Sequence, residues 1–105
     1  MKVLFALGVC VSLSVTPAFA ADSSAIALTT PTGTLHGSLL LPAGEAPVPV
    51  ALIIAGSGPT DRDGNSALIA TKNDSLKMLA EALAEAGFAS VRYDKRGIAA
   101  SAAHR

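Results

Sequence analysis

A Gly-Ser-Gly sequence at residues 56–58 has the residue types needed to present backbone N–H groups to negative charge. It follows residues 48–55, an almost wholly apolar run of the kind that forms a central strand of a parallel sheet, covered on both faces. Glycines let the backbone turn sharply and approach a ligand closely. The pattern therefore predicts a loop at the end of a strand whose N–H groups meet a phosphate or a developing oxyanion.

A second polar segment, residues 94–97 with the sequence DKRG, follows the short strand-like run 89–93. One helix lies between the two segments, so that strand, glycine loop, helix and strand form a crossover unit of a parallel sheet. The carboxyl ends of parallel strands meet at one edge of the sheet. We therefore expect any chemistry to lie in residues 55–65 and 94–97.

Apolar residues recur at helical spacing between Leu76 and Ala86, with charged residues on the opposite face, and predict the connecting helix. Gly87 is placed to end this helix in the left-handed conformation. Three residues are candidates to cap its start with a side chain, namely Asn73, Asp74 and Ser75.

The chain before the apolar strand predicts an antiparallel hairpin. Residues 25–30 and 34–41 are strand-like and flank a Pro-Thr-Gly sequence that suits a tight turn. Residues 42–49 contain three prolines and one glycine and are expected to form a connecting loop. The alanine-rich residues 98–105 are expected to begin a second helix.

The first twenty residues predict an export signal. Lys2 supplies a positive charge, residues 3–15 are apolar, and the small residues Ala18 and Ala20 fit a cleavage site. We expect cleavage after Ala20, a periplasmic or secreted product made of residues 21–105, and no stable membrane anchor.

Composition excludes several function classes. Lys and Arg together number eight, as do Asp and Glu, so the chain has no basic surplus to attract nucleic acid. Aromatic residues make up 4% of the chain, which argues against a surface that stacks bases. The single cysteine, Cys10, excludes an intrachain disulfide framework and a cysteine-based zinc site. The sequence predicts no metal and no cofactor.

Three phosphate- or metal-binding interpretations of the glycine loop fail on spacing. A dinucleotide fingerprint needs a third glycine where the sequence has Asp61. A phosphate-binding P-loop needs a Gly-Lys-Ser/Thr sequence that does not follow. A calcium loop starting at Asp61 has its glycine two residues early, at Gly64, and has Lys72 where it needs a bidentate acid. An oxyanion loop is the interpretation that remains.

Three strings of the sequence form a combined pattern: AGSGPTDRDGN at residues 55–65, NDSLKMLAEALAEAG at 73–87 and FASVRYDKRGIAAS at 88–101. In this pattern the sequence resembles the N-terminal part of bacterial exported α/β hydrolases. These exported proteins are related to the serine aminopeptidase-like and dienelactone-hydrolase-like branches of the superfamily. The resemblance covers roughly residues 24–101. It implies an α/β fold, with an antiparallel hairpin followed by a β-loop-α-β crossover of a mostly parallel sheet.

This resemblance implies roles for individual residues. Ser57 would donate its backbone N–H to the oxyanion, with Gly56 and Gly58 permitting the turn. Asp94 and Arg96 match a D-x-R-G turn that would anchor the oxyanion loop through charge-assisted hydrogen bonds.

The resemblance also leaves open points. Asp61, Arg62 and Asp63 either support the loop through ion pairs or form a solvated polar segment. Ala55 stands where many relatives have a histidine. After Gly97, the family pattern has a glycine at position 99, where this chain has alanine, a residue that resists a positive φ.

No serine in the chain is framed as Gly-x-Ser-x-Gly, the nucleophile motif of the superfamily. His36 and His104 come too early for the order of nucleophile, acid and base, and we expect both on the surface. We therefore expect the nucleophile, acid and base outside this chain, which would be inactive alone. The parent activity implied is a serine hydrolase acting on a small-molecule ester or amide. The alternative is a non-catalytic exported module that binds a ligand or partner, or an inactive truncated product.

Overall fold

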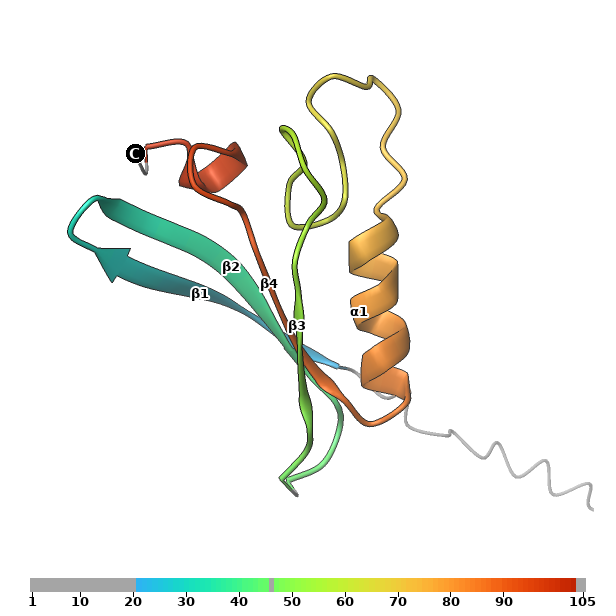
Figure 1. Cartoon of the computed structure of the whole chain (residues 1–105). Helices are drawn as coiled ribbons and strands as arrows, with labels where there is room; N and C mark the ends of the chain where they lie inside the picture. The colour runs from blue at the N-terminus through green and yellow to red at the C-terminus, as the bar shows by residue number, and fades with distance from the viewer. Residues whose placement is uncertain (1–20, 46, 104–105) are drawn as a thin grey trace, which may run out of the picture.

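The computed structural model describes residues 21–45 and 47–103, which form a four-stranded sheet with one helix against it (Figure 1). The strand order is β1-β2-β4-β3. The predicted export signal lies outside the described residues. No helix in the described ranges has the length and apolar character needed to cross a membrane.

The predicted N-terminal hairpin is confirmed. β1 (Asp22–Thr30) and β2 (Gly33–Leu41) pair antiparallel in a register that joins Thr30 to Gly33, so a two-residue turn connects them. The Thr30 hydroxyl donates to the carbonyl oxygen of Gly33 at 2.9 Å and closes this turn. β1 begins three residues before the predicted strand.

The predicted crossover unit is also confirmed. β3 (Val50–Ile53), α1 (Ser75–Glu85) and β4 (Ala89–Tyr93) follow one another, and β3 pairs parallel with β4. β2 lies antiparallel on the other side of β4, so the described sheet is mixed. β3 is shorter than the predicted run 48–55 and is the outer strand of the described sheet, not a central one.

One face of the sheet packs against α1. Leu40 of β2 and Ile53 of β3 contact Ala80 and Ala84 of the helix, whose small side chains let it approach the strands closely. On the opposite face Leu52 of β3 is 60% exposed, as no described helix covers it. The apolar composition of the strand, which predicts cover on both faces, is therefore satisfied on one face only.

The helix ends as predicted but begins differently. Gly87 has a φ of 88°, and the N–H of Phe88 donates to the Leu83 carbonyl at 2.8 Å, as in a Schellman ending. At the start, Asp74 occupies the cap position with a φ of 51°, and its side chain makes no capping bond. The Asn73 side chain instead accepts the Ser75 N–H at 3.0 Å, so the predicted side-chain cap is only partly right.

The predicted second helix is wrong in the described residues. The chain there forms a single 3₁₀ turn, η1 (Ala99–Ser101). Side chains from elsewhere hold this turn: the Asp94 carboxylate accepts the Ala100 N–H at 3.1 Å, and the buried Ser101 hydroxyl accepts the His36 N–H at 3.0 Å. Ala99 adopts the positive φ of 45° that the family pattern reserves for glycine.

We predict that Ala99→Gly stabilises the chain by up to about 1 kcal/mol, because it removes the left-handed strain on a residue with a Cβ. Urea denaturation followed by circular dichroism measures the change. Ala100→Gly is the matched control: φ of Ala100 is not positive, so this change should destabilise by about 0.5–1 kcal/mol through backbone entropy alone. Equal effects of the two substitutions would contradict the strain at Ala99.

Candidate functional site

The structure brings the glycine loop (residues 55–65) and residues 94–97 together at the carboxyl ends of β3 and β4, as the crossover predicts (Figure 1). The two residues that directly follow β4 bind separate parts of the loop. Asp94 binds Arg62, and the Lys95 ammonium donates to the carbonyl oxygens of Gly56 and Gly58, the latter at 2.8 Å.

Asp94 is the most heavily bonded side chain of the site. It is 2% exposed, and its carboxylate accepts four hydrogen bonds. Three come from Arg62: the backbone N–H at 2.8 Å, Nη2 at 3.0 Å and Nε at 3.3 Å. The fourth comes from the Ala100 N–H at 3.1 Å. A carboxylate removed from water needs such donors, and here they tie the loop and η1 to the end of β4.

A second ion pair also joins the loop to β4. Asp63 of the loop pairs with Nη1 of Arg92, which is 5% exposed in β4. Arg62 also donates from Nη1 to the Ser38 hydroxyl of β2 at 2.9 Å. Two ion pairs, Arg62–Asp94 and Asp63–Arg92, therefore join the loop to the end of the sheet. Of the two alternatives, residues 62 and 63 support the loop through ion pairs and do not form a solvated segment.

Arg96 does not have its predicted role. It is exposed, and its guanidinium has no bond to any part of the chain that the structure describes. The arginine that binds the Asp94 carboxylate is Arg62 of the loop, and the chain makes a turn at the exposed residues 96–97. Gly97, with a φ of 77°, permits this turn and donates its N–H to the Ser101 carbonyl at 3.0 Å.

The polar half of the loop is folded on itself by Asp61 and Asn65. One oxygen of the Asp61 carboxylate accepts the N–H groups of Asp63 at 2.9 Å and Asn65 at 3.0 Å. The Asp61 N–H in turn donates to the Asn65 carbonyl at 2.9 Å. Asp61 therefore supports the loop through hydrogen bonds to the backbone rather than through an ion pair.

Asn65 joins the loop to the start of α1. Its side-chain oxygen accepts the N–H groups of Asn73 and Asp74, both at 3.0 Å, and its Nδ2 donates to the Asp74 carboxylate at 2.6 Å. The residue is 9% exposed. Sequence reasoning missed it, because an asparagine in a polar loop gives no signal of which distant backbone groups it will bind.

The Gly-Ser-Gly segment keeps its acceptors occupied and its donors free. The Lys95 ammonium donates to the carbonyl oxygens of Gly56 and Gly58, and the Thr60 hydroxyl donates to the Ser57 carbonyl at 3.3 Å. Within the described part of the chain, the N–H groups of Gly56, Ser57 and Gly58 have no hydrogen-bond partner, and all three residues are exposed. Gly58 has a φ of 81°, a conformation that requires glycine here.

His36 and Ser66 make no described hydrogen bond to the N–H groups of residues 56–58. His36 is half-buried in β2, where its backbone binds Ser101 and Asp94, so the predicted surface position is only partly right. Ser66 accepts the Leu68 N–H at 3.2 Å. His104 lies outside the described residues. Across residues 21–45 and 47–103, no group of three His, Cys, Asp or Glu side chains is arranged to hold a metal ion.

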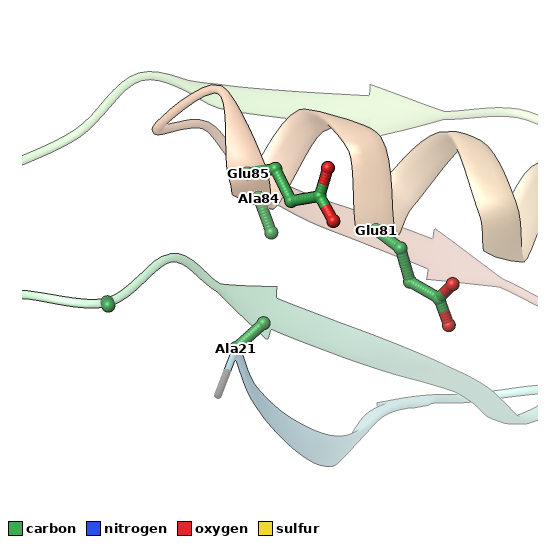
Figure 2. Close-up of a pocket in the computed structure, with 5 residues that line it drawn as sticks. Ala21, Glu81, Ala84 and Glu85 are labelled. Atoms are coloured by element: carbon green, nitrogen blue, oxygen red, sulfur yellow. The ribbon is translucent and has the colours of Figure 1, made fainter. Parts of the chain in front are cut away.

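Two cavities lie elsewhere on the structure. One of about 190 Å³ lies between Ala21 and the last turns of α1, where Glu81 and Glu85 border it (Figure 2). It is at the opposite end of the sheet from the glycine loop. The other, of about 360 Å³, lies on the uncovered sheet face and is lined mostly by apolar side chains such as Leu28, Leu52 and Tyr93.

Similar solved structures are α/β hydrolases. A serine hydrolase without a lid from Xanthomonas campestris is 32% identical, with a TM-score of 0.51 over 81% of this chain and 37% of its own. A cold-adapted esterase from an Arctic intertidal metagenomic library is 18% identical, with a TM-score of 0.55 over 73% of this chain and 29% of its own. No protein-family profile and no curated protein matches the chain.

The described residues therefore have part of the α/β-hydrolase fold. The chain belongs to the α/β-hydrolase superfamily, as its sequence resemblance implies, and spans about a third of the length of these two solved relatives.

We predict that Asp94→Asn destabilises the chain by about 3 kcal/mol, because it removes the charge that pairs with Arg62 in a buried position. Urea denaturation measures the loss. Asp22→Asn is the control, since Asp22 is an exposed carboxylate on β1 and its replacement should change stability by less than about 0.5 kcal/mol. A similar small effect at both positions would show that Asp94 does not anchor the loop.

Asn65→Asp should destabilise the chain by about 2 kcal/mol, because the side chain loses its donor and sets a second carboxylate against Asp74. Adding Asp74→Asn should restore most of the loss, since an asparagine at position 74 supplies the donor and tolerates the left-handed conformation. A double-mutant cycle of unfolding free energies measures the coupling. Additive losses would contradict the direct contact.

Proposed function

We propose that this chain supplies the oxyanion loop of a serine hydrolase that acts on a small-molecule ester or amide through an acyl-enzyme. One observation carries the proposal: in residues 56–58 every carbonyl is bonded, and none of the three N–H groups has a hydrogen-bond partner among the described residues. Ser57 donates its backbone N–H to the oxyanion of the tetrahedral intermediate. Its side chain is not the nucleophile.

Fixed donors make this loop suited to the task. A donor already aimed at the position where charge develops needs no reorganisation during the reaction, which is the main source of oxyanion stabilisation. The ion pairs Arg62–Asp94 and Asp63–Arg92 fix one end of the loop, and the other end continues from β3. The intervening glycine segment is thereby fixed at both ends.

The nucleophile, acid and base of the proposed reaction belong to segments outside this chain. We propose that residues 1–20 direct export to the periplasm or beyond and are removed after Ala20. The reaction as proposed uses no metal or cofactor. Translation of the DNA beyond Arg105 in all frames tests this proposal. A translated strand that ends in Gly-x-Ser-x-Gly, followed by an acid and then a histidine, would support it.

A second candidate function is a binding module without catalysis. It is favoured by the uncovered apolar face, where Val50, Leu52 and Ile54 are 63%, 60% and 61% exposed, and by the free edge of β3 in the described sheet. Such an edge accepts an extended segment of another chain. Lack of any downstream nucleophile in the DNA would favour this candidate over the hydrolase.

In a form of the protein that includes the nucleophile, Ser57→Pro should lower turnover by about 10²-fold or more, because proline removes the proposed donor. Ser57→Ala keeps the N–H and should stay close to wild type. Hydrolysis of a p-nitrophenyl ester measures both. A loss in Ser57→Ala as large as that in Ser57→Pro would refute the backbone donor.

The 105-residue chain alone should hydrolyse p-nitrophenyl esters no faster than buffer, since an oxyanion donor without a nucleophile and base offers no covalent route. Labelling by a fluorophosphonate tests the same point independently. Turnover that disappears when Ser57 is labelled would overturn the assignment of Ser57 as a donor only.

A further inference from the structure

Among the described residues, Lys95 is the one charged side chain that hydrogen-bonds to the Gly-Ser-Gly segment. Its ammonium donates to the Gly56 and Gly58 carbonyls, the latter at 2.8 Å, and the side chain is half-buried. Asp94, the neighbouring residue, holds the polar half of the loop through Arg62 instead. The glycine half of the loop is therefore bound by Lys95, and the polar half is bound by Asp94.

The Gly56 carbonyl belongs to the same peptide unit as the Ser57 N–H. A trans peptide is planar, and its carbonyl oxygen and N–H point in opposite directions. A cation that binds this oxygen therefore directs the Ser57 N–H away from itself. We propose that Lys95 is a positioning residue that sets the orientation of the Gly56–Ser57 peptide and so aims the oxyanion donor; the inference rests on the proposed function.

Two orientations of this peptide differ in the group that they present to an oxyanion. Rotation between them changes ψ of Gly56 and φ of Ser57 together. Glycine leaves the first angle almost unrestricted. Ser57 does not have a positive φ in the structure, and its Cβ disfavours the positive φ of the flipped orientation. In the flipped orientation the carbonyl oxygen would replace the N–H and repel an oxyanion. The ammonium of Lys95 stabilises the productive orientation by its bond to the Gly56 oxygen.

The positive charge of Lys95 also strengthens the Ser57 N–H as a donor, in addition to orienting it. An ammonium at the carbonyl end of a peptide polarises that peptide, which makes its N–H a stronger donor. Charge-assisted hydrogen bonds are about twice as strong as neutral ones, so a neutral side chain at position 95 would lose both the orientation and the polarisation. An arginine keeps the charge and has enough donors for two carbonyls.

The experiment measures backbone order in the ¹⁵N-labelled 105-residue chain by NMR relaxation. In wild type, the Ser57 amide should have an order parameter of about 0.85, as in rigid backbone. Lys95→Met should lower it below about 0.6, and Lys95→Arg should keep it near the wild-type value. Lys77→Met, an exposed position on α1, is the matched control and should leave it unchanged.

The Arg62 amide reports whether the rest of the loop is intact, because it donates to Asp94 independently of Lys95. Loss of order at Ser57 with retained order at Arg62 supports the proposal. An unchanged Ser57 in Lys95→Met overturns it. Equal loss at Arg62 also overturns it, because Lys95 would then hold the whole loop and not one peptide.

Kinetics separate this inference from the proposed function. In a form that includes the nucleophile, Lys95→Met should lower kcat with KM unchanged, and by less than the about 10²-fold expected on removing the donor itself. If Ser57→Pro leaves turnover unaffected while the NMR result holds, the oxyanion role fails and the orientation by Lys95 stands. If kcat falls only after Ser57→Pro, the oxyanion role stands and the inference about Lys95 fails.

Discussion

The buried carboxylate of Asp94 is the contact on which the glycine loop, η1 and the end of β4 all depend. Its four accepted hydrogen bonds come from two segments far apart in sequence. Its own backbone N–H donates to the His36 carbonyl at 2.9 Å, which ties the same residue to β2. A carboxylate this buried is stable only with such donors, so the loop geometry and the burial of Asp94 require each other.

The loop is organised in two halves with different kinds of support. The polar half is closed by Asp61 and Asn65, then fixed to β4 by ion pairs and to α1 by the Asn65 side chain. The glycine half has no such internal closure and relies on Lys95 and Thr60. This division allows the free N–H groups to lie in a segment of minimal side-chain bulk without making the whole loop mobile.

Much of the fold could be predicted from the sequence because it rests on local patterns. Alternation and turn residues predict the hairpin, helical spacing predicts α1, and Gly87 marks its end. The sequence resemblance assigns the anchoring of the loop to Arg96 together with Asp94 and leaves the role of Arg62 open. In the structure Arg62 bonds the Asp94 carboxylate, and the local sequence contains no signal of which guanidinium faces it. Sequence reasoning missed Asn65 and the 3₁₀ turn at residues 99–101 for a related reason. Both depend on side chains that bind backbone groups distant in sequence, at His36 and at the start of α1.

Within the described residues, the bonds that shape the glycine loop join residues between 36 and 101. These contacts therefore lie in one continuous stretch of chain. During synthesis on a ribosome, these contacts can form as soon as residue 101 has emerged. In a split-protein design, a cut made after this stretch would keep all of these contacts on a single piece, together with the four described strands.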